Sequence, residues 1–296
     1  MQIICINLNS KQKISIINLL LQLILYKINM KKLVSCIFLL NLFLCSYAQK
    51  NKKLIDGMYI QWGYNTEWYT LSNIHFKLTN GDNFTLHKAK AHDKPDFDAI
   101  LKKPAEISIP QYNYRIGFYI NKKHNKAIEL NFDHIKYVVT DGQKVKVTGN
   151  IDGISVNGDS ILNRANFLHL EHTDGGNLLH INYVQQNTIL KTVDQKRALI
   201  NLVWKAGAGI NIPRTDFTYR GDRFNNDFHI AGYNLSAEAG ARIYPFKNFF
   251  LEFTGKSGYV KYMNALANTT QLIGNRVTHG FGYFEIIGLF GFDIKF

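Results

Sequence analysis

Apolar and polar residues alternate along most of the chain after Lys53. In the last stretch the apolar set is Gly282, Phe284, Ile286, Gly288, Phe290, Phe292, Ile294 and Phe296, and the residues between them include Glu285, Asp293 and Lys295. A period of two is typical of β-strands, whose side chains point alternately to two faces. No segment after Lys53 repeats apolar residues at the three- and four-residue spacing of a helix. The pattern therefore predicts an all-β protein.

The same division into two faces recurs throughout the chain. Leu235, Ala237, Ala239, Ala241 and Ile243 oppose Ser236, Glu238, Gly240 and Arg242, and after a break at 244–248, Phe249, Leu251 and Phe253 oppose Glu252, Thr254 and Lys256. We expect twelve strands, at 57–67, 72–78, 83–90, 109–121, 126–140, 143–151, 163–172, 177–189, 199–211, 227–244, 248–262 and 279–296. Asp141-Gly142 predicts a two-residue hairpin turn. The segment 149–163, rich in Gly, Asn and Asp, leaves a single long loop and ten strands as an alternative.

A soluble sandwich and a membrane barrel both produce this alternation, but three features favour an antiparallel transmembrane β-barrel. Many segments reach lengths that suit tilted spanning strands of ~9–11 residues better than sandwich strands of ~5–6. Short connections at 121–125 and 245–248 alternate with long ones at 91–108, 212–226 and 263–278, as periplasmic turns alternate with external loops. Aromatic residues gather near strand ends, where interfacial girdles lie: Trp62, Tyr64, Trp68, Tyr69, Tyr244, Phe246, Tyr259 and Tyr262.

A secretory signal peptide is expected at residues 30–48. Lys31 and Lys32 form its basic region, residues 33–44 its apolar stretch, and Ser46-Tyr47-Ala48 a small-x-small cleavage site. Residues 1–29 have the character of an over-extended gene start, and an anchor at 14–28 is the competing interpretation. All three cysteines precede Ala48. We therefore expect residues 49–296 to form one barrel domain without disulfides or thiolate metal sites.

The C-terminal strand, which ends in Phe296, resembles the terminal signal of bacterial outer-membrane barrels. The segment 240–248, GARIYPFKN, is similar to hairpins in barrels of the Bacteroidota type, and the Ile/Lys/Asn-rich composition suits such a genome. The resemblance implies a location in the cell outer membrane of a Gram-negative bacterium and identifies no activity. It implies contact with membrane lipid and lipopolysaccharide, and recognition of the last strand by the barrel-assembly machinery. The net charge of +13 falls to +8 without the five lysines of residues 1–48, a mildly basic balance that fits anionic surroundings or a solvated surface, and nucleic acid is not expected as a partner of an exported chain.

Charged residues on the polar strand faces are expected to point into the barrel. They are Arg115, Glu129, Asp133, Lys205, Glu238, Arg242, Glu252 and Lys256. In a narrow barrel such charges form a packed ion network more often than a pore lining or a catalytic site. Our first hypothesis is therefore a barrel with a structural, adhesion or narrow-pore role.

The second hypothesis is a barrel hydrolase that acts on phospholipid or lipopolysaccharide. The segment 169–177, HLEHTDGGN, loosely resembles the His-x-Ser-Asn-Gly stretch of outer-membrane phospholipases, with His172 as base, Thr173 or another hydroxyl as nucleophile and Glu171 nearby. The position two residues after His172 is Asp174 rather than serine, and strand alternation sends Thr173 to the opposite face. The structural interpretation of the segment is an Asp-Gly-Gly hairpin turn with polar flanks.

The same segment offers one candidate metal site. His169 and Glu171 share a strand face, and His180 on the next strand would complete a set of two imidazoles and a carboxylate that suits zinc. Spacing of two residues on a strand is commonplace in a chain with ten histidines. The sequence has no Walker or Rossmann glycine motif, and we expect no cofactor.

Overall fold

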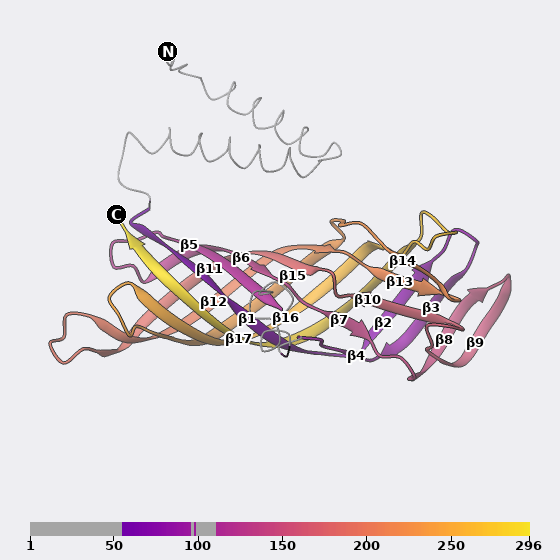
Figure 1. The fold of residues 1–296 in the computed structure, drawn as a ribbon, viewed down its shortest axis with the longest axis horizontal. Coiled ribbons are helices and arrows are strands. Elements are labelled where there is room, and N and C mark those ends of the chain that lie inside the picture. The colour runs from indigo at the N-terminus through magenta and orange to yellow at the C-terminus, as the bar shows by residue number, and fades with distance from the viewer. Residues whose placement is uncertain (1–54, 96–97, 99–110) are drawn as a thin grey trace, which may run out of the picture. The chain divides into compact units, whose positions relative to one another are not determined.

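The computed structural model describes residues 55–95, 98 and 111–296 (Figure 1). Within them, regular structure consists of antiparallel β-strands, β1 to β17. The described residues contain no helix that is long and apolar enough to cross a membrane. The expected leader segments, 1–29 and 30–48, and most of the expected loop 91–108 lie outside the described residues.

Eight strands close into a ring. In the order in which they pair, they are β1 (Gly57–Tyr69), β5 (Tyr112–Tyr119), β6 (Lys126–Asp133), β11 (Gly176–Lys191), β12 (Ala198–Pro213), β15 (Gly232–Ile243), β16 (Phe249–Leu266) and β17 (Arg276–Lys295). Strands β1 and β17 close the ring along their length, from Gly57 opposite Lys295 to Tyr69 opposite Tyr283. Because the ring has no free edge, its backbone groups pair with neighbouring strands and need no water.

The outside of the ring is apolar and its inside is polar. Each strand exposes large apolar side chains on the outer face, represented by Ile60, Ile116, Leu130, Ile181, Leu202, Leu235, Phe253 and Ile286, which are 40–59% exposed. Their neighbours point inward and are buried, as Glu285 is beside Ile286. This is the reverse of a soluble protein and is the arrangement of a barrel that lipid surrounds. Closed barrels of this kind reside in outer membranes, so the expected fold class and location are confirmed.

The main sheet contains twelve strands, of which only eight close the ring. The other four continue the sheet from the first residues of β17: β2 (Ser72–Lys77), β3 (Asn83–Ala89), β8 (Lys144–Ile151) and β9 (Ile154–Ile161). The twelve strands are not the twelve that were expected, because 154–161 was not expected as a strand and the strand expected at 163–172 belongs to a second sheet. Residues 276–278 of β17 lie beyond its pairing with β1 and pair with β2 instead. Alternation predicts that these segments are strands, but it does not predict what covers their apolar face. For the four-strand extension, the cover is a protein layer rather than lipid.

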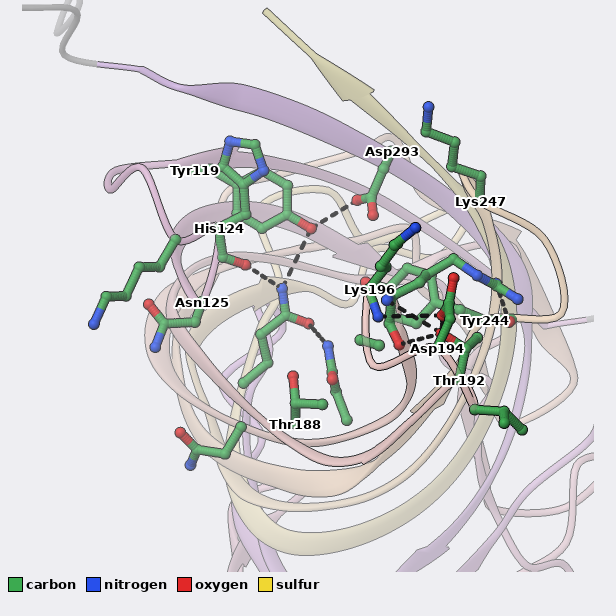
Figure 2. A pocket seen from close by; sticks show the side chains of 17 residues that line it. Tyr119, His124, Asn125, Thr188, Thr192, Asp194, Lys196, Tyr244, Lys247 and Asp293 are labelled. Atoms are coloured by element: carbon green, nitrogen blue, oxygen red, sulfur yellow. Dashed lines mark hydrogen bonds between the residues drawn. The ribbon is translucent and has the colours of Figure 1, made fainter.

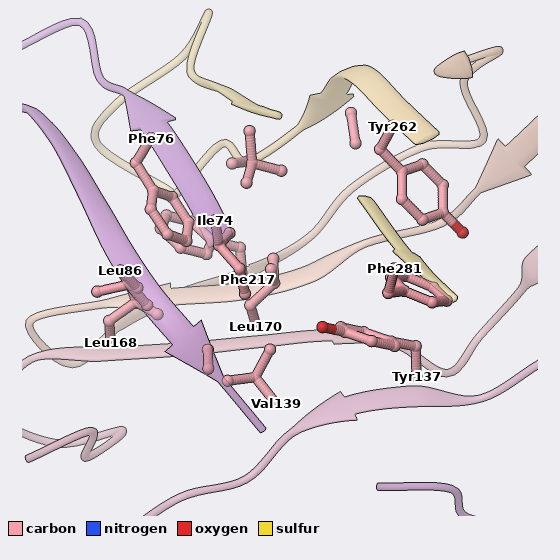
Figure 3. Close-up of a cluster of buried hydrophobic side chains, with 14 of the residues drawn as sticks. Ile74, Phe76, Leu86, Tyr137, Val139, Leu168, Leu170, Phe217, Tyr262 and Phe281 are labelled. Carbon is pink, nitrogen blue, oxygen red and sulfur yellow. The ribbon is translucent and has the colours of Figure 1, made fainter. Parts of the chain in front are cut away.

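A second sheet covers the four-strand extension. It consists of β14 (Asp222–Asn225), β13 (Asp216–Tyr219), β10 (Leu168–His172), β7 (Tyr137–Val139) and β4 (Ala91–His92), in that order. Figure 3 shows the core between the two layers, with Phe76 and Leu86 facing Leu170 and Phe217. Phe76 stacks on Phe217 with ring centroids 5.5 Å apart. A small β-sandwich therefore stands at the end of the barrel opposite the described termini (Figure 1).

The turn at Asp141-Gly142 is not a hairpin turn. It is a corner between the two sheets, because β7 pairs with β4 and β10 whereas β8 pairs with β3 and β9. The hairpin turn of this region is Asp152-Gly153, where both residues have positive φ, at 54° and 74°. Such a turn matches the twist of paired strands. The segment 149–163 therefore forms most of a hairpin rather than a long loop.

Candidate functional site

The structure brings the eight charged residues expected inside the barrel into one buried network. Arg115, Glu129, Asp133, Lys205, Glu238, Arg242, Glu252 and Lys256 are each at most 4% exposed. Their side chains come from β5, β6, β12, β15 and β16, so they converge from most of the ring. Buried charges in such numbers require partners of opposite sign, because an unpaired buried ion is costly.

Two of the ion pairs cross the full width of the lumen. Arg115 on β5 contacts Glu238 on β15, with Nη1 to Oε1 at 2.7 Å, and these strands are four places apart in the ring of eight. Lys256 on β16 pairs with Asp133 on β6, and these strands are also four places apart. Strands in such positions face each other across a barrel, so the two pairs close the interior from wall to wall.

Lys205 and Arg242 extend this network toward the end of the barrel that holds the described termini. The Lys205 ammonium lies 2.7 Å from Glu252 Oε1 and 3.1 Å from Glu129 Oε2. Arg242 donates to Glu252 Oε2 at 2.7 Å. Its guanidinium also lies over the ring of Tyr59, 4.4 Å from the centroid, which holds it by a cation–π contact.

Two further titratable residues belong to the network. His180 lies 3.5 Å from Asp133 and 3.4 Å from Lys256, and Glu285 lies 3.7 Å from Lys256. The sequence signal for Glu285 was its position on the polar face of the last strand. His180 was expected in a metal site instead, and the register of β11 against β6, with His180 opposite Asn131, places it in the lumen.

His180 therefore does not join His169 and Glu171. His169 lies on β10, with Nδ1 2.8 Å from Asp141 Oδ1 and Nε2 3.6 Å from Glu171 Oε2. Burial lowers the pKa of His169, but the two carboxylates outweigh burial and raise it above the usual value. Among the described residues, no three His, Cys, Asp or Glu side chains form a group suited to a metal ion. The arrangement is an ion pair between a buried histidine and carboxylates at the edge of the sandwich.

His172 is enclosed in the sandwich core and has no exposure. Its Nδ1 lies 3.0 Å from Thr215 Oγ1, and its Nε2 lies 3.1 Å from Nε2 of His279. Thr173, the nucleophile considered from the sequence, stands in the turn after β10. Burial lowers the pKa of His172 to about 3, so the ring is neutral at pH 7. A base that no lipid can reach gives the hydrolase alternative no support.

Figure 2 shows a cavity of about 1090 Å³ at the end of the barrel that holds the described termini. Its floor is a chain of hydrogen bonds. Asn201 Nδ2 donates to Gln186 Oε1 at 3.0 Å, Gln186 donates to the carbonyl of His124 at 2.5 Å, and Tyr119 donates to Asp293 at 2.7 Å. Its rim carries Lys123, Lys196, Arg197 and Lys247. Sequence reasoning did not single out this cavity, although the cations lie in the short turns between strands.

No protein-family model and no curated protein sequence matches the chain. Among solved structures, it is similar to Neisserial surface protein A (10% identity, 81% of this chain and 97% of that chain covered, TM-score 0.33). It is also similar to Ail, the attachment invasion locus protein of Yersinia pestis (11% identity, 80% and 99% covered, TM-score 0.32), and to the outer membrane protein OprG of Pseudomonas aeruginosa (12% identity, 82% and 98% covered, TM-score 0.37). The assignment of the fold rests on the strand pairing of this chain.

Proposed function

We propose that the protein is a non-conducting outer-membrane anchor that presents the external β-sandwich at the cell surface, in a structural or adhesive role. The observation that carries the proposal is the pair of cross-lumen contacts, Arg115 with Glu238 and Lys256 with Asp133. A pore needs a continuous water path, and these buried contacts occupy its cross-section. Buried ion pairs that join opposite walls make the barrel a rigid support. The sandwich rests directly on it, because four of its strands continue the sheet of the barrel.

Conductance in planar bilayers tests this proposal. The purified chain is expected to give no current steps, because the ion pairs fill the lumen. Insertion is verified in the same preparation by protease protection of the barrel strands. A double variant, Arg115→Ala with Glu238→Ala, removes one cross-lumen contact without leaving a lone charge from that pair and is expected to raise the current above that of the parent. Reproducible steps from the unaltered protein would instead establish a pore.

The proposal includes export and assembly. Residues 30–48 would be removed on export, and the barrel-assembly machinery would recognise the last strand through Phe296, whose side chain is 64% exposed. The proposal also assigns the chain to barrels of the Bacteroidota type, which the resemblance of hairpin 240–248 and the composition support. Deletion of Phe296 is expected to lower the amount of protein in isolated outer membranes, and an unchanged amount would remove this part of the proposal.

Lipopolysaccharide is the proposed neighbour of the outer rim. Along β16, the outward-facing residues change from the apolar Phe253 to Tyr259 and then to the cationic Lys261. Along β17, read toward its first residue, they run from Gly282 to the cationic Arg276. Lys77 on β2 lies opposite Arg276. Cations just beyond an apolar band are placed to contact the phosphate groups of the outer leaflet. Replacement of Lys77, Lys261 and Arg276 by glutamate is expected to reduce the lipopolysaccharide that copurifies with the protein, and an undiminished amount would exclude this contact.

A further inference from the structure

The cavity at the barrel mouth faces the periplasm. The first residue of β1, the last residues of β17 and the short connection 245–248 all lie at this end, and both ends of an even-stranded outer-membrane barrel lie on the periplasmic side. The hairpin of β11 and β12 extends one wall, because both strands continue beyond their pairing with β6 and β15. The cavity is therefore open to the compartment that contains the cell wall.

The charges of this cavity are unbalanced. Lys123, Lys196 and Lys247 are exposed, and no acidic side chain among the described residues pairs with them. The described lining has four cationic side chains, these three and Arg197, against two carboxylates. Asp293 accepts from Tyr119, and Asp194 accepts from the hydroxyl of Thr192 and the backbone N–H of Lys196. The rim therefore favours an anionic ligand.

The floor adds neutral polar groups for a ligand that is more than a simple anion. Asn125, Gln186, Asn187 and Asn201 bring four amide side chains to one cavity. Oδ1 of Asn201 is buried and lacks a hydrogen-bond partner within the described part of the chain, and Asn201 itself is 6% exposed. A buried acceptor without a partner costs free energy unless a donor from a ligand or water reaches it. Hydroxyl and amide groups of a ligand are suitable donors.

We propose that this cavity binds a carboxylate-bearing glycopeptide, the chemistry of the bacterial cell wall. The lysines of the rim would hold the peptide carboxylates, and the amides of the floor would hydrogen-bond to sugar hydroxyls and peptide groups. The volume of about 1090 Å³ is slightly above the ~300–1,000 Å³ of ordinary ligand pockets, so it admits a disaccharide with a short peptide. The barrel would thus be tethered to the cell wall beneath the membrane.

The test uses the full chain in detergent and two probes. Insoluble cell-wall sacculi report binding by co-sedimentation, and a soluble disaccharide-tetrapeptide reports it by calorimetry. The variant Lys196→Glu with Lys247→Glu reverses two exposed rim charges and is expected to weaken binding about tenfold or more. The matched variant Lys144→Glu with Lys146→Glu makes the same change on the exposed face of β8, in the sandwich, and is expected to bind as the parent does.

Three results would overturn the proposal. They are an absence of binding by the parent, equal binding by both double variants, and complete competition by phosphatidylglycerol vesicles, which would identify a lipid headgroup as the ligand. Retained mobility of the folded barrel on an unheated gel shows that the variants are assembled. Binding at this mouth is independent of conductance, so the anchor proposal and the glycopeptide proposal fail separately.

Discussion

Arg115 and Glu238 stand on opposite walls of the barrel, and their side chains meet at 2.7 Å in its interior. The guanidinium also lies 3.4 Å from Glu252 and 4.0 Å from Asp133, so one cation serves three carboxylates. Strand pairing alone connects neighbours around the ring, whereas this contact connects strands four places apart. The cross-section of the barrel is therefore maintained by side chains as well as by backbone hydrogen bonds.

Replacement of Arg115 by methionine is expected to destabilise the barrel by about 3–5 kcal/mol, the usual cost of removing one partner of a buried ion pair. Glu238, Glu252 and Asp133 would remain buried with less positive charge nearby. Urea unfolding of the purified barrel in lipid vesicles measures the difference.

An exposed ion pair of the same chain is the control for this variant. Lys144 and Asp159 lie 3.1 Å apart, but their side chains are 69% and 54% exposed. Lys144→Met is expected to change the free energy of unfolding by no more than about 1 kcal/mol. Similar effects of the two variants would contradict a stabilising role for the lumenal network.

A second prediction concerns the close approach between Gly117 and Tyr59. A Cβ atom on Gly117 would lie 2.0 Å from Cζ of the Tyr59 ring. The ring would have to leave its position beneath Arg242 and lose its hydrogen bond to Glu129, now 2.7 Å long. Gly117→Ala is expected to cost about 1–3 kcal/mol in the same unfolding experiment. Gly158→Ala is the matched change, since no atom lies within 4 Å of its Cβ position, and a comparable loss there would refute the steric explanation.

Alternation was sufficient to predict that the charged residues of the polar strand faces occupy the lumen, although His180, which lies there too, was expected elsewhere. Once a strand such as β17 is closed into a ring, parity alone sends Glu285 inward and Ile286 outward. For the same reason, the eight charged residues expected inside the barrel could be named without knowledge of the strand order. Their partners could not be named, because contacts such as Arg115 with Glu238 depend on which strands face each other.

The β-sandwich could not be predicted from the same pattern. Ile74 and Phe76 alternate with polar residues as the lipid-facing residues do, but they pack against a second sheet. That sheet is made of strands of two to five residues, such as β4 and β10, which are too short to show a period.

The surroundings of His172 could not be predicted either. The hydroxyl that hydrogen-bonds to its ring belongs to Thr215, which lies 43 positions away, rather than to the adjacent Thr173.

A third prediction is that the sandwich loosens in acid. Burial lowers the pKa of His172 to about 3 and that of His279 well below its usual value, to which the neighbouring His172 and Lys261 contribute. The folded state holds both rings neutral, whereas the unfolded state protonates them below about pH 6.5. The free energy of unfolding is therefore unaffected by these histidines above about pH 6.5 and falls below it by about 1.4 kcal/mol per pH unit for each histidine. Hydrogen exchange of β10 and β17 amides at pH 7.5 and 5.0, corrected for intrinsic rates, measures this loss.

His172→Phe separates this effect from general acid sensitivity. Phenylalanine keeps an aromatic ring between Tyr137 and Tyr262 but cannot be protonated. The variant is expected to reduce the difference in stability between pH 7.5 and 5.0 by about half, since one of two titrating rings is removed. His75→Phe, on the exposed face of β2, is expected to leave the difference unchanged. An unaltered difference in His172→Phe would show that other groups control the response.

The last prediction compares two isoleucines that differ only in their surroundings. Ile181 on β11 is 59% exposed and Ile161 on β9 is 60% exposed, so accessibility alone does not distinguish them. Ile181 belongs to the apolar band around the ring, whereas Ile161 lies on the sandwich opposite Lys144, in water. Ile181→Arg is expected to cost about 2–4 kcal/mol in refolding into lipid vesicles, as charge near the middle of a bilayer does. Ile161→Arg is expected to change stability by no more than about 0.5 kcal/mol, because it leaves an exposed residue exposed. Equal effects would mean that lipid does not surround the ring.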